Sequence, residues 1–267
     1  MNLKPVIAIA AFAAAAAAPV PAAAQKVGDI ALMDGAQYMM VSELKTPEQN
    51  DLFNYNVNTM RRYAGKLKEL QTRLREEKDE AKKAEIQKVF DALDKEFKAN
   101  DEIMRKQYAF ASNRKYKMIF LSSNICTALS KEELSNLKTS DGAQMDPMRI
   151  IQKNGANYYR LKSIEGTREN AQLQRSLGTM FAQKAGLNEL RKEIASTMDA
   201  SKQMKLTKKL SEDEMAMKAA DAELRRKYGI SENKNYIVEI EHSQIWLELS
   251  PQELAIIKGR QAAEAKK

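Results

Sequence analysis

The sequence predicts a mostly helical α+β protein that contains two tandem copies of one structural unit. Three observations support this fold class. The chain resembles itself at an offset of 120 residues, long segments have helical periodicity, and a stretch of period two follows each of them. Charged residues make up 30% of the chain, with only 10 glycines and 6 prolines, a composition typical of long helices and coiled coils.

The duplication is clearest where residues 101–138 align without a gap on residues 221–258. It extends towards the N-terminus, because residues 34–38 (DGAQY) resemble residues 154–158 (NGANY). The repeated feature is architecture, which indicates that no single catalytic residue organises the chain. The positions that define this repeat signature are Tyr108, Asn113, Tyr116, Ser130, Glu133 and Leu134 in the first copy, and Tyr228, Asn233, Tyr236, Ser250, Glu253 and Leu254 in the second.

Residues 1–24 are typical of a secretion signal peptide. Lys4 supplies the positive charge, residues 6–18 form an alanine-rich apolar run, and small residues lead to a predicted cut between Ala24 and Gln25. A membrane anchor is the alternative, but a spanning helix needs about 20 strongly apolar residues and this run is shorter. We therefore expect a soluble exported chain of 267 − 24 = 243 residues, either periplasmic or secreted.

The net charge of the chain is +8, which falls to +7 when Lys4 is removed with the signal. Export argues against nucleic acid as a partner and leaves acidic proteins, anionic membranes or polysaccharides. A solvated basic helix face is the alternative explanation. The predicted contacts for an anionic partner are Lys202, Lys205, Lys208 and Lys209 in the second copy, and Lys82, Lys83 and Lys88 in the first copy are further candidates.

The first copy spans residues 25–138 and opens with a short predicted strand at residues 28–33. Apolar residues then recur as in a coiled-coil seam, stop at residues 75–85, and begin again. One interpretation is a single helix of about 60 residues. We favour the other, an antiparallel hairpin with its tip near residues 78–82, because two arms bury each other's seams. The predicted seam residues are Val57, Met60, Tyr63, Ala64, Leu67, Leu70 and Leu74, then Ile86, Val89, Phe90, Leu93, Phe97, Ile103 or Met104, and Tyr108.

The second copy spans residues 148–260, after a polar linker at residues 139–147. Its predicted arms flank residues 196–201, which are rich in helix-capping side chains, so the same hairpin is expected here. Residues 261–267 form a polar tail. The predicted seam residues are Leu187, Leu190 and Ile194 in one arm, and Met204, Leu206, Leu210, Met217 and Leu224 in the other.

Each hairpin is followed by a segment in which apolar residues alternate with a period of two. In the second copy, residues 236–240 form one expected strand in which Glu239 faces water. A turn at residues 242–244 leads to a second expected strand at residues 245–249, in which Trp246 faces water. Each copy is therefore expected to contain two short antiparallel strands.

A short helix is predicted to close each copy. Ser130 with Glu133, and Ser250 with Glu253, both fit a capping box, in which the serine caps the helix and the glutamate lies three residues later. Pro251 falls at the first helical position, where its missing N–H has no intrahelical partner to lose. These signals are structural rather than functional.

The chain carries no recognisable catalytic or metal-binding motif. It contains one histidine and one cysteine, His242 and Cys126, and they lie at non-equivalent positions of different copies. We interpret His242 as a turn residue and Cys126 as a small core or boundary residue. With a single cysteine the chain forms no intrachain disulfide. We expect a non-enzymatic protein without a metal or another cofactor.

The order of elements resembles that of the Skp/OmpH family of periplasmic chaperones. The resemblance rests on the first strand at residues 29–34 and on the helical arms. It also rests on the strand after the second arm, at residues 116–119 or 236–239, and on the closing helix that starts at Ser130 or Ser250. It implies a helical hairpin on a small β-rich body, and a trimer whose arms enclose an unfolded outer-membrane protein. The duplication departs from the family, which has one unit per chain, and puts the trimer in doubt.

The resemblance implies a holdase-type chaperone that keeps unfolded envelope proteins soluble without ATP. A structural adaptor or spacer of the cell envelope that binds one folded partner is the alternative, and a binder of anionic lipid or polysaccharide surfaces is a third. A holdase should leave apolar side chains exposed diffusely along its arms, whereas an adaptor should show one compact patch. Self-association of the chain is compatible with each of these functions.

Overall fold

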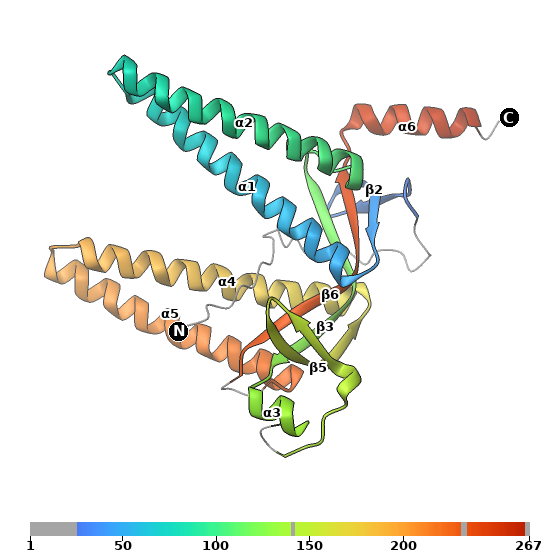
Figure 1. Cartoon of the computed structure of the whole chain (residues 1–267), viewed down its shortest axis with the longest axis vertical. Helices are drawn as coiled ribbons and strands as arrows, with labels where there is room; N and C mark the ends of the chain where they lie inside the picture. Colours follow the sequence, from blue (N-terminus) through green and yellow to red (C-terminus); the bar gives the residue numbers. More distant parts are fainter. Residues whose placement is uncertain (1–25, 140–141, 231–233, 265–267) are drawn as a thin grey trace. The chain divides into compact units, whose positions relative to one another are not determined.

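The protein is an α+β protein with mostly helical secondary structure (Figure 1). The computed structural model describes residues 26–139, 142–230 and 234–264. The predicted cut between Ala24 and Gln25 lies outside the described residues. The described strands are β1 (Ile30–Met33), β2 (Ala36–Leu44), β3 (Tyr116–Ala128), β4 (Ile150–Lys153), β5 (Ala156–Glu165) and β6 (Tyr236–Glu248). The described helices are α1 (Pro47–Glu76), α2 (Glu80–Tyr108), α3 (Lys131–Asn136), α4 (Thr167–Ser196), α5 (Ala200–Tyr228) and α6 (Pro251–Glu264), with a 3-10 turn η1 (Pro147–Arg149).

Two long helical hairpins dominate the fold, and the hairpin interpretation of the sequence is confirmed. Helices α1 and α2 pack side by side, as do α4 and α5. Each tip contains only three residues, 77–79 and 197–199, and ends in an aspartate that caps the next helix. Asp79 accepts hydrogen bonds from the backbone of Ala81 and Lys82, and Asp199 caps α5 in the same way.

Most of the predicted seam residues lie in the contact between the two arms of their hairpin. In α1, buried or half-buried positions recur from Phe53 to Leu74 at three- and four-residue steps. In α2 the helical phase places Met104 rather than Ile103 in the seam, because Met104 is fully buried whereas Ile103 is exposed. Ala64, Val89 and Met204 were also predicted in the seam, but the structure places all three on the exposed side.

A β-hairpin precedes each helical hairpin, where the sequence interpretation predicted only one short strand. Strands β1 and β2 are antiparallel, and so are β4 and β5. Their turns are Asp34-Gly35 and Asn154-Gly155, and all four residues have positive φ. Aspartate or asparagine followed by glycine is the preferred sequence for such two-residue turns. This signal was present in the sequence and identifies the missing strands β2 and β5.

The prediction of two short strands after each helical hairpin was wrong. Strands β3 and β6 each run for 13 residues without a turn. Residues 243 and 244 of β6 are paired with Leu44 and Glu43 of β2, so His242 lies within a strand. No glycine or proline interrupts residues 242–244, and the ladder to β2 stabilises the extended backbone there.

The expected alternation of buried and wet side chains in β6 was also wrong at two positions. Trp246 is fully buried in a cluster with Met33, Met40 and Ile119. Glu239 is buried because its carboxylate is paired with Arg160 at 3.0 Å and accepts a hydrogen bond from Asn124 at 3.3 Å. A buried carboxylate requires such partners, since its desolvation is otherwise costly.

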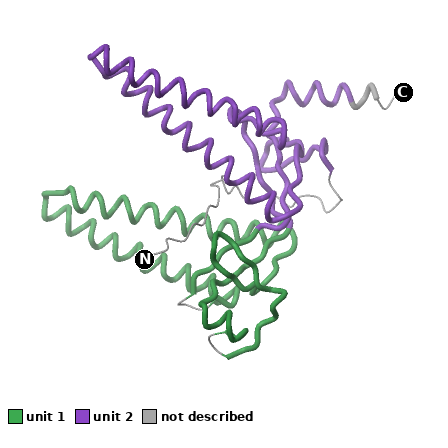
Figure 2. The backbone as a smooth tube through the Cα atoms, in the orientation of Figure 1, with its two compact units in different colours: residues 1–7, 122–239 green, residues 8–121, 240–267 purple. Residues whose placement is uncertain are grey.

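The described chain forms two compact units, each built from segments of both sequence copies (Figure 2). Unit 1 contains residues 122–239, and unit 2 contains the described residues up to 121 and from 240 onwards. The units therefore differ from the contiguous domains predicted at residues 25–138 and 148–260. The cause is the length of β3 and β6, since each strand begins in one unit and ends in the other.

The same strand order is present in both units. In unit 2 the order is β1-β2-β6-β3, and in unit 1 it is β4-β5-β3-β6. The core of unit 2 lies between its strands and the base of the α1–α2 hairpin, where the ring of Phe53 makes edge contacts with Tyr108 at 5.1 Å and Phe110 at 5.5 Å. The base of the α1–α2 hairpin is therefore anchored in a core that packs on the sheet.

Candidate binding surface of the helical hairpins

The outer parts of the hairpin arms are thin, because only one helix packs on the other there. All the buried residues of α1 lie between Asn50 and Met60, close to the sheet. The remaining residues of this 30-residue helix extend about 24 Å further, at 1.5 Å per residue. Two-helix arms of this kind bury little of their own surface and offer much of it to a partner.

Large apolar side chains are exposed singly along these arms. In unit 2 they belong to α1 and α2, and in unit 1 to the tip and to α5. The exposed fraction is 65% for Tyr55, 55% for Val89 and 61% for Met215. The full set on the two hairpins is Leu52, Tyr55, Val89, Ile103, Met198, Met204 and Met215.

One short apolar strip occurs on α2. Val89, Ala92 and Leu93 line an open, shallow depression that is bordered by Glu85, Lys88 and Glu96. These positions follow each other at three- and four-residue steps and therefore share one face of the helix. The strip is small and open, which suits loose apolar contact rather than enclosure of a small molecule.

The four predicted lysines lie together in the first half of α5. Lys202 is paired with Glu193 of α4 at 2.9 Å, and Lys208 lies 3.9 Å from Glu212. Lys205 and Lys209 are exposed on the same helix. The lysines are thus gathered near the tip of the α4–α5 hairpin and not on the sheet.

Asp101 and Asp221 are a further pair of identical residues at the 120-residue offset, and they have a structural role at the base of the hairpins. Asp101 accepts a 2.6 Å hydrogen bond from Arg105 and a 2.7 Å hydrogen bond from the backbone N–H of Ser112, so it closes the loop after α2. These contacts lower the pKa of Asp101 in spite of its desolvation, which acts in the opposite direction. Asp221 and Arg225 form the same pair in unit 1, at 2.5 Å.

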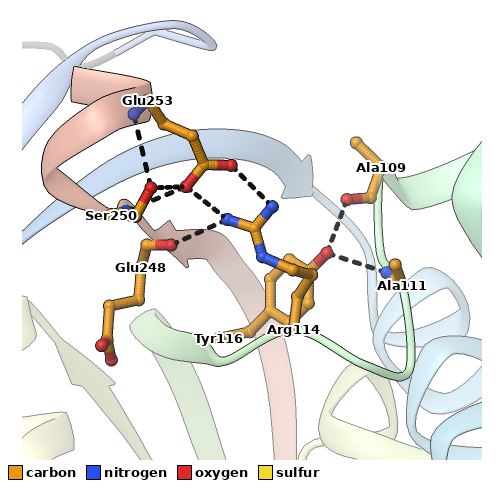
Figure 3. Close-up of polar contacts among 7 residues, drawn as sticks. All are labelled: Ala109, Ala111, Arg114, Tyr116, Glu248, Ser250 and Glu253. Carbon is orange, nitrogen blue, oxygen red and sulfur yellow. Dashed lines mark hydrogen bonds and ion pairs between the residues drawn. The ribbon is translucent and has the colours of Figure 1, made fainter. Parts of the chain in front are cut away.

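Figure 3 shows how Tyr116 and Arg114 fasten the segment after α2. The hydroxyl of Tyr116 donates a hydrogen bond to the carbonyl of Ala109 and accepts one from the N–H of Ala111. Arg114 donates two hydrogen bonds to the carboxylate of Glu253, at 2.7 and 2.9 Å. Such bidentate pairs fix both distance and orientation.

The carboxylate of Glu253 has two structural roles, the ion pair with Arg114 and the capping of α6 with Ser250. It accepts hydrogen bonds from the backbone N–H and the hydroxyl of Ser250, which completes the capping interaction at the start of α6. Hydrogen bonds from Ser250, followed by the Arg114 guanidinium, lower the pKa of Glu253 to about 2. The remaining signature residue of this helix, Leu254, donates its N–H to the carbonyl of Ser250.

Unit 1 contains the matching arrangement. Ser130 and Glu133 form a complete capping box at α3, and Glu133 is also paired with Lys234. The next signature residue, Leu134, donates its N–H to the carbonyl of Ser130. Burial raises the pKa of Tyr236 to about 12. Asn113 lies in an exposed turn, and Asn233 lies outside the described residues.

Two asparagines that our interpretation of the sequence missed hold the hairpins to the strands. Asn50 donates to the carbonyls of Thr46 and Glu241, and its side-chain oxygen accepts a 2.5 Å hydrogen bond from Ser243. Asn170 binds Ser123 in the same way. Asn50 and Asn170 are identical residues at the 120-residue offset, which is the signal that could have identified them.

The two residues considered for catalysis or metal binding, Cys126 and His242, do not form a site with each other. Cys126 is fully buried in β3, and His242 in β6 lies 2.7 Å from the carboxylate of Glu43. Within the described ranges, no group of three or more His, Cys, Asp or Glu side chains is placed to hold a metal ion.

Comparisons of the chain with protein-family models, curated proteins and solved structures found no match. None of the helices within the described residues combines the length and apolar character needed to span a membrane. The hairpin surface therefore has to be interpreted from its own geometry.

Proposed function

We propose that the chain is an exported holdase-type chaperone that binds unfolded envelope proteins along its hairpin arms. The observation that carries this proposal is the distribution of exposed apolar side chains. Tyr55, Val89 and Met215 are exposed on three different helices. Unfolded chains offer scattered apolar groups in no fixed arrangement, and a diffuse surface with flexible methionines suits such clients.

The positive charge of the chain fits the same function. The net charge of +7 that remains after removal of the signal attracts acidic clients over a distance that depends on ionic strength, and it speeds their capture more than it tightens the complex. Binding by weak apolar contacts needs no ATP. Release then follows when the client buries its apolar groups in its own fold or in a membrane.

The test is the aggregation of an outer-membrane protein diluted from urea, followed by light scattering. The chain from Gln25 to Lys267 should suppress scattering at a near-stoichiometric ratio, and the effect should weaken as salt is raised. Full aggregation at a several-fold excess of the chain would exclude the holdase proposal.

A triple variant isolates the contribution of the exposed apolar groups. Tyr55→Gln, Val89→Gln and Met215→Gln keep the charge and use a good helix former, so the hairpins should remain folded while suppression weakens. The matched control carries Tyr55→Phe, Val89→Leu and Met215→Leu, which retains apolar groups and should retain activity. Equal activity of the two variants would mean that these side chains are not the client surface.

An envelope adaptor with one folded partner is the second candidate, and the apolar strip on α2 favours it. In that case crosslinks from a photoreactive group at Ala92 should identify one folded protein at a fixed ratio. A holdase should instead give crosslinks to many unfolded clients, from positions on both hairpins.

A further inference from the structure

The two hairpin tips differ in their side chains, although both consist of three residues that end in a capping aspartate. The tip of the α4–α5 hairpin consists of residues 197–199, and the side chain of Met198 at its centre is completely exposed, at 102%. The equivalent residue at the tip of the α1–α2 hairpin is Lys78, at the 120-residue offset. A fully exposed methionine gains nothing from the fold, because its apolar surface stays in water.

A second exposed methionine lies close to this tip. Met204 is 71% exposed, and it lies about 6 Å along α5 from the first residue of that helix. The equivalent residue of α2 is Ala84. The α4–α5 tip thus presents two long apolar side chains at positions where the other tip has a lysine and an alanine.

The charge of the two tips differs in the same direction. Residues 191–209 contain six basic and two acidic side chains, which gives a net charge of +4. The equivalent residues 71–89 contain six basic and five acidic side chains, which gives +1. Of the two acidic groups near the second tip, Glu193 is paired with Lys202, and Asp199 caps α5 through two backbone N–H groups.

We propose that the tip of the α4–α5 hairpin docks on the surface of an anionic phospholipid bilayer. Met198 and Met204 enter the interface between headgroups and acyl chains, while Lys205, Lys208 and Lys209 contact lipid phosphates. Apolar anchors surrounded by basic side chains are the combination that binds peripheral proteins to anionic lipid. A purely basic tip would bind any polyanion, and a purely apolar tip would not distinguish anionic from neutral lipid.

This proposal goes beyond the holdase function and does not depend on it. The arms provide the surface for a client, whereas the tip provides a place at a membrane. A chain that holds clients but does not dock, or one that docks but does not hold clients, would separate the two proposals.

The first experiment places a polarity-sensitive dye at each tip in turn. Met198→Cys and Lys78→Cys each introduce one reactive thiol, since the native Cys126 is fully buried. The form used begins at Gln25, so that the apolar N-terminal segment cannot bind lipid, and it retains every described residue. Vesicles of phosphatidylcholine with about one-third phosphatidylglycerol should shift the emission of the dye at residue 198 to the blue and leave the dye at residue 78 unchanged.

The control vesicles consist of phosphatidylcholine alone and should shift neither dye. Equal shifts at both tips, or no shift at residue 198 with anionic vesicles, would overturn the proposal. A shift at residue 198 on addition of an acidic protein or a polysaccharide, with none on addition of anionic vesicles, would also overturn it and assign the tip to that partner.

The second experiment measures affinity by vesicle co-sedimentation without any dye. Met198→Gln with Met204→Ala removes both apolar side chains without changing the charge and should reduce binding to anionic vesicles by about tenfold or more. The matched control is Met215→Ala, an exposed methionine that lies farther from the tip, and it should change binding by less than about twofold. Unchanged binding of the double variant would contradict the role of the methionines.

Discussion

Asn50 ties the first turn of α1 to a strand that comes from the other sequence copy. Its amide donates to backbone carbonyls and accepts from Ser243 at a fully buried position. Asn50→Ala removes these side-chain hydrogen bonds at a buried position, so we expect the free energy of unfolding to fall by about 2–3 kcal/mol. Urea titration followed by circular dichroism measures the loss.

The matched control for Asn50 is Asn100→Ala in α2. Asn100 donates only to the carbonyl of Glu96 within its own exposed helix, so its removal should cost less than about 0.5 kcal/mol. Equal losses for the two variants would mean that the bond between Asn50 and Ser243 contributes nothing specific.

Glu253 should make unit 2 sensitive to acid. Its pKa is about 2 in the folded protein and near 4.5 when unfolded, so the unfolded state binds the proton first as pH falls. The stabilisation is therefore complete above pH 4.5 and disappears as pH falls towards 2. Because the side chain is 35% exposed, solvent screening reduces the expected effect to about 1 kcal/mol.

The variant Glu253→Gln removes this titration, and its stability should fall less than that of the wild type between pH 4.5 and 2. Arg114→Gln should keep a large part of the pH dependence, since the hydrogen bonds from Ser250 lower the pKa most. Chemical denaturation at four or five pH values distinguishes these outcomes. Parallel acid curves for wild type and Glu253→Gln would contradict this role.

At the scale of the elements, the second helical hairpin has a defect in its seam. The side-chain oxygen of Gln183 is buried without a hydrogen-bond partner. The equivalent residue in the first hairpin is Tyr63, whose pKa is raised by a hydrogen bond to Glu96 of the facing arm. Gln183→Leu should therefore stabilise the α4–α5 hairpin by about 1 kcal/mol.

The control for this substitution is Gln203→Leu on the exposed side of α5, which should change stability by less than about 0.5 kcal/mol. Thermal unfolding followed by helical circular dichroism compares the two variants. A lower midpoint for Gln183→Leu would show that the amide has a partner in solution.

The helical hairpins could be predicted from the sequence because their contacts are local. A seam that runs through Val57, Leu67 and Leu74 needs a facing arm, and the nearest one is the next helix of the same chain. The strands could not be predicted so well. Whether residues 242–244 turn or continue depends on their pairing with β2, nearly 200 positions away, and the alternation pattern alone does not contain that information.

The candidate surface was predictable only in part. The cluster of Lys202, Lys205, Lys208 and Lys209 follows directly from the sequence. The exposure of Met204 does not, because a methionine at helical spacing fits a seam as well as a surface. Only the phase of α5 against α4 decides between these positions.

At the scale of the whole molecule, the composition of the two units could not be predicted from the repeat. Arg114 is paired with Glu253, 139 positions away, and Glu133 with Lys234, 101 positions away. Both pairs join one sequence copy to the other, whereas a contiguous repeat predicts pairs within each copy. A sequence shows which residues are equivalent but not which of two equivalent partners is used.

This exchange of segments predicts how the chain responds to a cut between the two sequence copies. A protease site inserted after Gly142, in an exposed turn, divides the chain into one fragment per copy. Unit 1 pairs β3 of the first fragment with β5 of the second, and unit 2 pairs β2 of the first with β6 of the second. The cleaved protein should therefore elute from size-exclusion chromatography as a single species that contains both fragments, with the helical content of the uncut chain.

In urea, dissociation of the two fragments and loss of their helical content should occur in the same transition, because neither fragment retains a complete sheet alone. Two fragments that separate in native buffer, each with intact helical hairpins, would mean that each copy folds on its own and that the strands do not exchange in solution.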